Sequence, residues 1–234
     1  MSARFLAVVP CIDQDRFETF HDRCGWHPAD VVFIDNTPDR SLRPTIDAGW
    51  AMPRILVGKS RTVAGAWNIG AGEVIARQLD WLVICSSSLR FGPAGGQDFT
   101  DALAEHHGRA AVDSQHGWHL IAIARWALLE VGLFDEGFAP AYFEDTDWLY
   151  RAGLAGVPSP RENDGRFGFE PCDAECPTAE TLRRGLAAVD MDAQEARYVA
   201  KWGGTQGHER FIRPFDGALR DPLAPPSTAP TLDA

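Results

Sequence analysis

Short apolar runs, each closed by a small or polar residue, mark the first half of the chain. We predict buried strands at 4–10 (RFLAVVP), 31–34 (VVFI), 54–58 (RILVG) and 81–88 (WLVICSSS). The runs are continuous rather than alternating, which is typical of strands covered on both faces of a sheet. Segments with helical spacing separate them, so the order of elements predicts parallel neighbouring strands joined by right-handed crossovers.

The segment between the third and fourth predicted strands combines a helical pattern with two glycines. Apolar side chains from Val63 to Leu79 recur on one side, but Gly70 and Gly72 interrupt the pattern. Each interior glycine costs about 1 kcal/mol relative to alanine in a helix, so each needs a reason. Either a ligand or a strand approaches closely, or a loop precedes a helix that begins near Glu73.

The rest of the chain carries further elements of both kinds. We predict strands at 110–112 and 119–124, and helices at 13–24 (N-cap Asp13), 98–107 (exposed), 125–131, 178–188 and 193–201. Asp192 with Glu195 predicts the capped start of the last helix, and Gly203 its end. Residues 159–178 are polar, aperiodic and rich in proline and glycine, which indicates a lid, an acceptor loop or a mobile segment.

Composition favours one globular domain at residues 1–220 and a disordered, proline-rich tail at 221–234. No stretch of 18 apolar residues occurs and the N-terminus lacks the features of a signal peptide, so no membrane span is expected. Five cysteines, an odd number, lie mostly in apolar settings, which predicts reduced thiols in a cytoplasmic protein. The formal net charge of −11 argues against extended nucleic-acid binding.

Residues 132–156 (GLFDEGFAPAYFEDTDWLYRAGLAG) concentrate acidic and aromatic side chains. This mixture indicates carboxylates held at the edge of an apolar wall, where burial and like charges tune a pKa. A helix is predicted to start at Asp145, with Asp147 and Arg151 paired four residues apart. Glu144 and Asp145 would then lie at its positive end. The alternative is an ordinary N-capped surface helix.

The pattern FDEGF…YFEDTDWLYRAGLAG resembles the C-terminal part of the family 2 glycosyltransferases, and the similarity extends over much of residues 4–156. The resemblance implies an α/β fold, a single GT-A domain with a central, mostly parallel mixed sheet flanked by helices. It also implies inverting sugar transfer, with Asp145 as the general base. Glu144 would tune or contact the acceptor, and Asp147 would hold Arg151 at the substrate site.

Residues beyond the predicted strands are the candidates for binding the donor. Ligands of parallel sheets bind beyond the carboxyl ends of the strands, which brings Pro10 and residues 35–39 to one pocket. FIDNTPD resembles the family's second strand, whose aspartate contacts the nucleoside, and Asp35 is the matching residue. A turn-forming role for this Asp/Asn/Pro cluster is compatible with that contact. AWNIGAG resembles a segment that lines the donor pocket, which adds Asn68.

The fourth strand departs from the family. Its members carry an acidic DXD-like motif there, whose aspartate holds a divalent cation, whereas this chain has Ser86-Ser87-Ser88. Serine hydroxyls are poor ligands for Mg²⁺ or Mn²⁺, so a metal cofactor is doubtful. Either Arg90, Arg61 and hydroxyls such as those of Ser86 and Ser88 meet the diphosphate charge, or a metal is held weakly, or activity has been lost.

Three further features bear on ligands. In GT-A enzymes a C-terminal basic residue often covers the diphosphate, and His208 is the matching position here and the candidate metal ligand. His116, Trp118 and His119 lie around the turn DSQHGW, where they contact substrate or support the turn. The expected donor is a UDP-, GDP- or dTDP-sugar. The acceptor is a protein, a glycan, a small molecule or a modified nucleobase.

The sequence also bears on three other classes of protein. A catalytically degenerate nucleotide-sugar-binding protein is favoured by the missing acidic motif and opposed by the ED pair. A sugar-nucleotide nucleotidyltransferase would need a glycine-rich, basic loop after the first strand, and VVPCIDQD lacks one. No G-x-G-x-x-G follows a strand, which disfavours a dehydrogenase.

Overall fold

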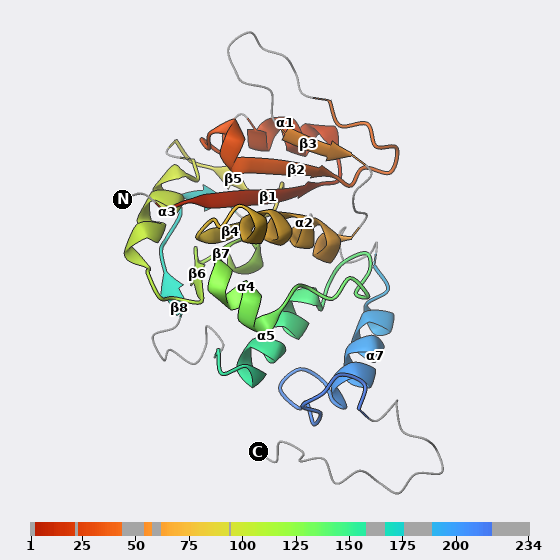
Figure 1. Ribbon diagram of the computed structural model, residues 1–234. Helices are drawn as coiled ribbons and strands as arrows, with labels where there is room; N and C mark the ends of the chain where they lie inside the picture. Colours follow the sequence, from red (N-terminus) through yellow and green to blue (C-terminus); the bar gives the residue numbers. More distant parts are fainter. Residues whose placement is uncertain are drawn as a thin grey trace, which may run out of the picture.

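A mixed sheet forms the centre of the molecule (Figure 1). The computed structural model describes residues 3–21, 23–43, 54–57, 62–93, 95–157, 167–175 and 189–216. Within them the sheet has seven strands in the order β3-β2-β1-β4-β7-β6-β8. The strands are β1 (Phe5–Cys11), β2 (Val31–Asp35), β3 (Arg54–Val57), β4 (Trp81–Cys85), β6 (Ala111–Asp113), β7 (Leu120–Ala124) and β8 (Phe167–Phe169).

The strand directions make one edge of the sheet a natural binding edge. Strand β1 is parallel to β2 and β4, β2 is parallel to β3, and β6 is parallel to β8. Strand β7 is antiparallel to both of its neighbours, β4 and β6. The other six strands therefore end at the same edge, here called the carboxyl edge, where ligands of such sheets bind. The predicted α/β fold class is confirmed.

Helices cover both faces of the sheet. They are α1 (Gln14–His21), α2 (Val63–Ala76), α3 (Gln97–Ala102), α4 (Arg125–Val131), α5 (Glu144–Leu154) and α7 (Met191–Trp202). Short 3-10 turns form η1 (Pro28–Asp30), η2 (Leu103–Glu105) and η3 (Gly117–His119), and β5 (Arg90–Phe91) pairs with β9 (Ala174–Glu175) in a separate ribbon.

Alternating side chains of the central strands hold the layers together. On one face, Phe33 of β2 packs edge-on against Phe17 of α1, with ring centroids 4.9 Å apart. On the other face, α2 lies so close that a Cβ atom at Gly70 would come within 2.8 Å of the Cβ of Val8. Gly70 is therefore required by the close approach of a strand.

The two possible explanations for the glycines are thereby resolved. Helix α2 runs without a break through Gly70 and Gly72, so a loop before Glu73 is wrong. Gly72 faces open space, where a Cβ would meet nothing within 4 Å. Nothing in the structure explains glycine at that position.

Several other predictions need correction. The 98–107 segment is half-buried rather than exposed, because Phe99 and Leu103 enter the core. The last helix begins at Met191, and its N-cap is Asp190, whose side chain accepts a hydrogen bond from the Ala193 N–H. Strands β8 and β9 were not anticipated within 159–178. The predicted helix at 178–188, the predicted tail at 221–234, Arg61 and Cys176 lie outside the described residues.

The C-terminal helices form a second layer beside the sheet. Helix α5 packs on α4, and α7 lies next to α5 (Figure 1). Phe138, Tyr198 and Trp202 form a small apolar cluster of their own between these segments, and Tyr150 of α5 packs against it. Residues 189–216 are thereby anchored to the rest of the molecule.

Cys11, Cys24, Cys85 and Cys172 are all buried as free thiols, in line with their apolar sequence settings. Among the described residues, every helix falls short of the length and apolarity needed to cross a lipid bilayer.

Candidate active site

The ends of three neighbouring strands bring several predicted donor-site residues to one place. Pro10 and Cys11 of β1 lie in register with Ile34 and Asp35 of β2. On the other side of β1, β4 ends at Cys85, so Ser86 follows directly at the carboxyl edge. The ends of β1, β2 and β4 thus place Pro10, Asp35 and Ser86 at this edge, and the predicted pocket formed by Pro10 and residues 35–39 stays a prediction.

Asp35 is completely buried, and its carboxylate organises the turn that follows β2. Oδ1 accepts hydrogen bonds from the N–H and the hydroxyl of Thr37 at 3.0 and 2.5 Å. Oδ2 accepts from the Leu42 N–H at 3.3 Å. These bonds define an Asx turn, the structural role considered for this cluster. The contact of Asp35 with a nucleoside stays a prediction.

The three serines form a compact turn rather than a row of free hydroxyls. The Oγ atoms of Ser86 and Ser88 lie 2.6 Å apart, and the Ser86 N–H donates to the His119 carbonyl at 2.9 Å. This bond places η3 and its Trp118 beside the serines. Burial and the nearby His116 lower the pKa of His119, which favours its neutral form. Arg90 is exposed in β5, opposite Glu175 of β9.

The described residues do not present an evident divalent-cation site. Among them, no group of three or more His, Cys, Asp or Glu side chains is arranged to hold a metal ion. The neutral hydroxyls of Ser86 and Ser88 do not fit the carboxylate-rich ligand set of Mg²⁺ or Mn²⁺.

The ED pair begins α5, as its position in the sequence predicted. Tyr142 and Phe143 precede it with φ of 75° and 70°, a left-handed conformation that is strained for bulky residues. Strain of this kind needs support from its surroundings and clusters at functional sites. The loop before α5 is therefore held in an unusual shape just where it presents the two carboxyls.

Glu144 and Asp145 occupy different environments. Glu144 is only 4% exposed and its Oε2 has no hydrogen-bond partner among the described residues. Burial, and secondarily the charge of Asp145, raises its pKa to about 8. Asp145 is partly exposed, and its Oδ1 accepts from the Thr146 N–H at 2.7 Å. Burial also raises the pKa of Asp145, against those hydrogen bonds.

The loop that carries the pair lies at the carboxyl edge. The Val63 N–H, at the start of α2, donates to the Pro140 carbonyl at 3.0 Å. Just before it, the Thr62 carbonyl accepts from the Asn36 side-chain amide, next to Asp35, at 3.4 Å. Contacts thus run from the end of β2 to the loop before Glu144. The turn after β2 and the loop before the ED pair therefore belong to one region.

An aromatic wall lies beneath this region. Trp67 stacks on Trp118 with centroids 5.5 Å apart, Phe134 packs edge-on against Trp67 at 5.0 Å, and Phe134 stacks on Trp148 of α5 at 5.9 Å. Trp148 belongs to the helix that the two acids begin, and Phe134 belongs to the FDE turn. That the acids lie at the edge of this wall stays a prediction.

Asn68 fastens the FDE turn to α2. Its side-chain amide exchanges two hydrogen bonds with the backbone of Phe134, at 2.9 and 2.8 Å, and donates a third to Glu136 at 2.9 Å. These contacts give Asn68 a supporting role behind the site. Its predicted contact with the donor stays a prediction.

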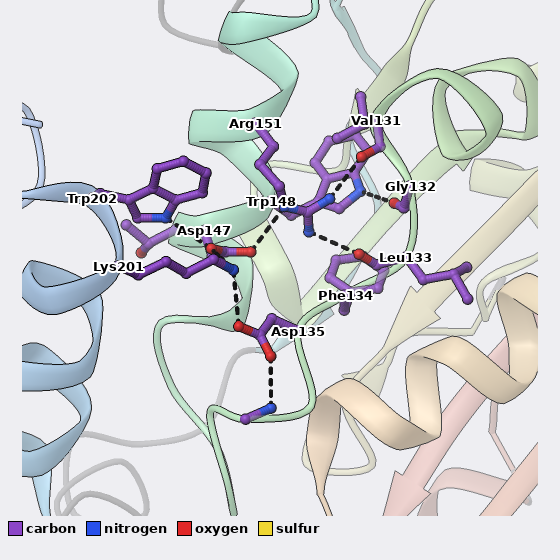
Figure 2. Close-up of polar contacts among 12 residues, drawn as sticks. Val131, Gly132, Leu133, Phe134, Asp135, Asp147, Trp148, Arg151, Lys201 and Trp202 are labelled. Atoms are coloured by element: carbon purple, nitrogen blue, oxygen red, sulfur yellow. Dashed lines mark hydrogen bonds and ion pairs between the residues drawn. The ribbon is translucent and has the colours of Figure 1, made fainter. Parts of the chain in front are cut away.

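Asp147 and Arg151 are paired as predicted, at 3.0 Å, but in a buried setting (Figure 2). The Arg151 guanidinium also donates to the carbonyls of Val131 and Leu133, at 2.7 and 2.8 Å. Oδ1 of Asp147 accepts from the Trp202 indole at 2.8 Å and contacts the Lys201 ammonium at 2.5 Å. The pair therefore braces α5, and its predicted role in donor binding stays a prediction.

His208 lies in an exposed turn after α7. The segment that contains it packs against α5, where the Tyr150 hydroxyl donates to the Phe211 carbonyl at 2.9 Å. The predicted place of His208 over the diphosphate stays a prediction.

Two residues of this region were missed in the sequence. Asp135 was considered only as part of the FDEGF pattern, and Lys201 only as the last residue of the predicted helix 193–201. A signal for Lys201 existed, because it lies between Tyr198 and Trp202 on the face of α7 that packs inward. A lysine on an apolar helical face needs a buried partner.

We compared the chain with known proteins by sequence and by structure. No family model matches the chain. A galactofuranosyl glycosyltransferase of Leishmania donovani is 26% identical over 114 residues, which cover 48% of this chain and 26% of that protein.

A mannosyltransferase of Pyrobaculum calidifontis, PcManGT, solved in complex with GDP-Man and Mn²⁺, superposes with a TM-score of 0.50 and 14% sequence identity. The match covers 85% of this chain and 65% of the neighbour. The likeness is thus one of fold. The matched regions span about a quarter of the relative and just under two thirds of the structural neighbour.

Proposed function

We propose that this protein is an inverting glycosyltransferase of the family 2 type, which moves a sugar from a nucleoside-diphosphate sugar to an acceptor hydroxyl. The main observation is the placement of Asp145. Its partly exposed carboxyl, with a raised pKa, lies at the start of α5 in the region that contains the strand ends. A general base needs such accessibility and a pKa moved toward the working pH.

In the proposed reaction, Asp145 accepts the proton of the acceptor hydroxyl while that oxygen attacks the anomeric carbon. The bond between this carbon and the diphosphate oxygen breaks on the opposite face, and the nucleoside diphosphate departs with the bonding electrons. Preplaced donors stabilise the charge that develops on the leaving group. The hydroxyls of Ser86 and Ser88 and the exposed Arg90 are the candidates among the described residues.

The names of the similar proteins support this proposal and suggest the first donors to test. The sequence relative is a galactofuranosyl glycosyltransferase, and the structural neighbour was solved with GDP-Man. The Mn²⁺ of that neighbour makes a divalent cation plausible here as well, although Ser86–Ser88 supply no carboxylate for it.

The neutral serine turn favours a second candidate, a nucleotide-sugar-binding protein without catalysis. Measurements of donor binding and of sugar transfer distinguish a transferase from a non-catalytic binding protein. Purified protein is titrated by calorimetry with UDP-, GDP- and dTDP-sugars, galactofuranosyl and mannosyl donors included, and sugar release or transfer is then followed. Binding without turnover would support the second candidate. Failure to bind any of these donors would contradict both.

The substitution Asp145→Asn tests the mechanism directly. It keeps the shape of the side chain but removes the proton acceptor, so transfer should fall by about 10²–10⁴-fold while donor affinity holds. The matched control is Asp192→Asn, an exposed aspartate at the same second position of helix α7. Normal transfer by Asp145→Asn would exclude Asp145 as the base.

A further inference from the structure

Lys201 of α7 is buried between two carboxylates (Figure 2). Its Nζ lies 2.8 Å from Oδ2 of Asp135 and 2.5 Å from Oδ1 of Asp147. The lysine side chain is 7% exposed, and the Asp147 side chain is fully buried. One ammonium group therefore bridges two segments that come from different parts of the chain.

The two carboxylates stand on either side of the loop that presents the ED pair. Asp135 lies in the FDE turn before the loop, and Asp147 lies in the first turn of α5, two residues after Asp145. The Lys201 ammonium thus joins the beginning of the loop to its end. Between these points the chain carries the strained residues Tyr142 and Phe143. Such a backbone persists only where its surroundings restrain it.

The charge of the Lys201 ammonium stabilises the ionised form of its carboxylate partners. Burial opposes ionisation of Asp135, but the hydrogen bonds from Lys201 and the Gly137 N–H, with the charges of Lys201 and Arg197, lower its pKa to about 2. Loss of the ammonium would remove the cation that Asp135 and Asp147 share, and leave two neighbouring like charges whose other cationic partners, Arg197 and Arg151, pull in separate directions. Two such groups separate or take up water rather than remain close.

We propose that Lys201 is a positioning residue for the reaction: its ammonium holds Asp135 and Asp147 together and so sets the place of Asp145. This inference deepens the proposed function and rests on it for the role of Asp145. The proposal also gives α7 a role in catalysis. This helix near the C-terminus supplies the side chain that fixes the loop between Asp135 and Asp147.

Kinetics of Lys201→Met provide the first test. The methionine retains the length and apolar packing of the lysine but not its charge. We expect kcat to fall by about 10²-fold, the effect of displacing a catalytic group by roughly 1 Å, with donor affinity unchanged. The matched control is Arg197→Met. Arg197 lies one turn earlier on α7, and it forms its ion pair with Asp135, at 3.2 Å, rather than with Asp147. Its kcat should stay within threefold of wild type.

A charge-balanced variant keeps the test decisive if Lys201→Met folds poorly. In Lys201→Met/Asp135→Asn a cation and an anion are removed together, so the remaining Asp147 keeps Arg151 and Trp202 as partners. We expect the double variant to unfold at a denaturant concentration near that of wild type and to retain the low kcat. Recovery of wild-type kcat would overturn the proposal, because charge balance alone would then be sufficient.

Hydrogen exchange followed by mass spectrometry tests the bridge without any assay of transfer. Peptides covering 135–147 should exchange faster in the double variant than in wild type, while peptides of β1 and β4 remain unchanged. Unaltered exchange in 135–147 would overturn the proposal whatever the activity. Faster exchange in a protein whose wild type transfers no sugar would contradict the proposed function and leave the bridge established.

Discussion

Replacement of Glu144 by glutamine should stabilise the protein, and should do so increasingly as the pH rises. Glu144 is 4% exposed with a pKa raised from 4.5 to about 8. Below pH 4.5 the carboxyl is protonated in both the folded and the unfolded chain and contributes no pH dependence. Above that value the unfolded chain ionises first, so stability is lost as the pH rises toward 8, and the loss is complete above 8.

The size of the effect follows from this interval. Each pH unit within it corresponds to about 1.4 kcal/mol, which gives about 3 kcal/mol at pH 7 and about 5 kcal/mol in full. Glutamine keeps the shape of the protonated side chain and does not ionise. The advantage of Glu144→Gln over wild type in the free energy of unfolding should therefore grow by about 2.5 kcal/mol between pH 5.5 and pH 7.5.

Urea unfolding followed by tryptophan fluorescence at pH 5.5, 6.5, 7.5 and 8.5 measures this difference. The control is Glu130→Gln, which makes the same substitution at an exposed position on α4. A constant difference between Glu144→Gln and wild type across this range would refute the reasoning. It would mean that Glu144 is ionised in the folded protein, with a partner for its second oxygen.

Three further outcomes are expected. Asp35→Ala should weaken binding of the nucleoside diphosphate by about 1–3 kcal/mol in calorimetry; unchanged affinity in a folded variant would confine Asp35 to its turn. Asn68→Ala removes three hydrogen bonds to the FDE turn and should lower the free energy of unfolding by about 1–3 kcal/mol, and equal urea midpoints would contradict this. Nucleotide binding should survive EDTA with less than a tenfold loss, about 1.4 kcal/mol, whereas Ser88→Asp should weaken it without metal and regain part of the loss with Mn²⁺. Collapse of wild-type binding in EDTA would reveal a metal site.

The sheet and its helices were largely predictable because their signals are local. Strand β2 is a short apolar run closed by Asp35, and α4 has the predicted bounds, with Gly132 at its end at a φ of 88°. Strand β8 was missed for the opposite reason. The sequence FGF has no periodicity of its own, and it becomes a strand only through pairing with β6, far away in the chain. The glycines of α2 misled in part, since tertiary packing explains Gly70 and not Gly72.

The site shows the same division. Helix signals were sufficient to place Glu144 and Asp145 at the start of α5. The full set of partners of Asp147 was not predictable, because two of them come from a distant helix. Asp147 was matched with Arg151 by spacing, but Lys201 and Trp202 reach it only once α7 has docked. His208 was matched only by its place near the C-terminus, and its contact with the donor stays a prediction.

The rate at which a reagent labels the buried cysteines measures local opening of the folded protein. Thiol reagents attack the thiolate, and burial raises the pKa of Cys11, Cys85 and Cys172, so labelling of the native protein must wait for local opening. Cys85 ends the central strand β4, whereas Cys172 lies between β8 and the β5–β9 ribbon and is held by the Gly95 carbonyl. The Cys176→Ser substitution removes the thiol outside the described residues. In that variant, the labelling rates of Cys85 and Cys172 would report separately on opening at the end of β4 and near the β5–β9 ribbon. Addition of a nucleotide sugar would then show which of the two openings the ligand suppresses.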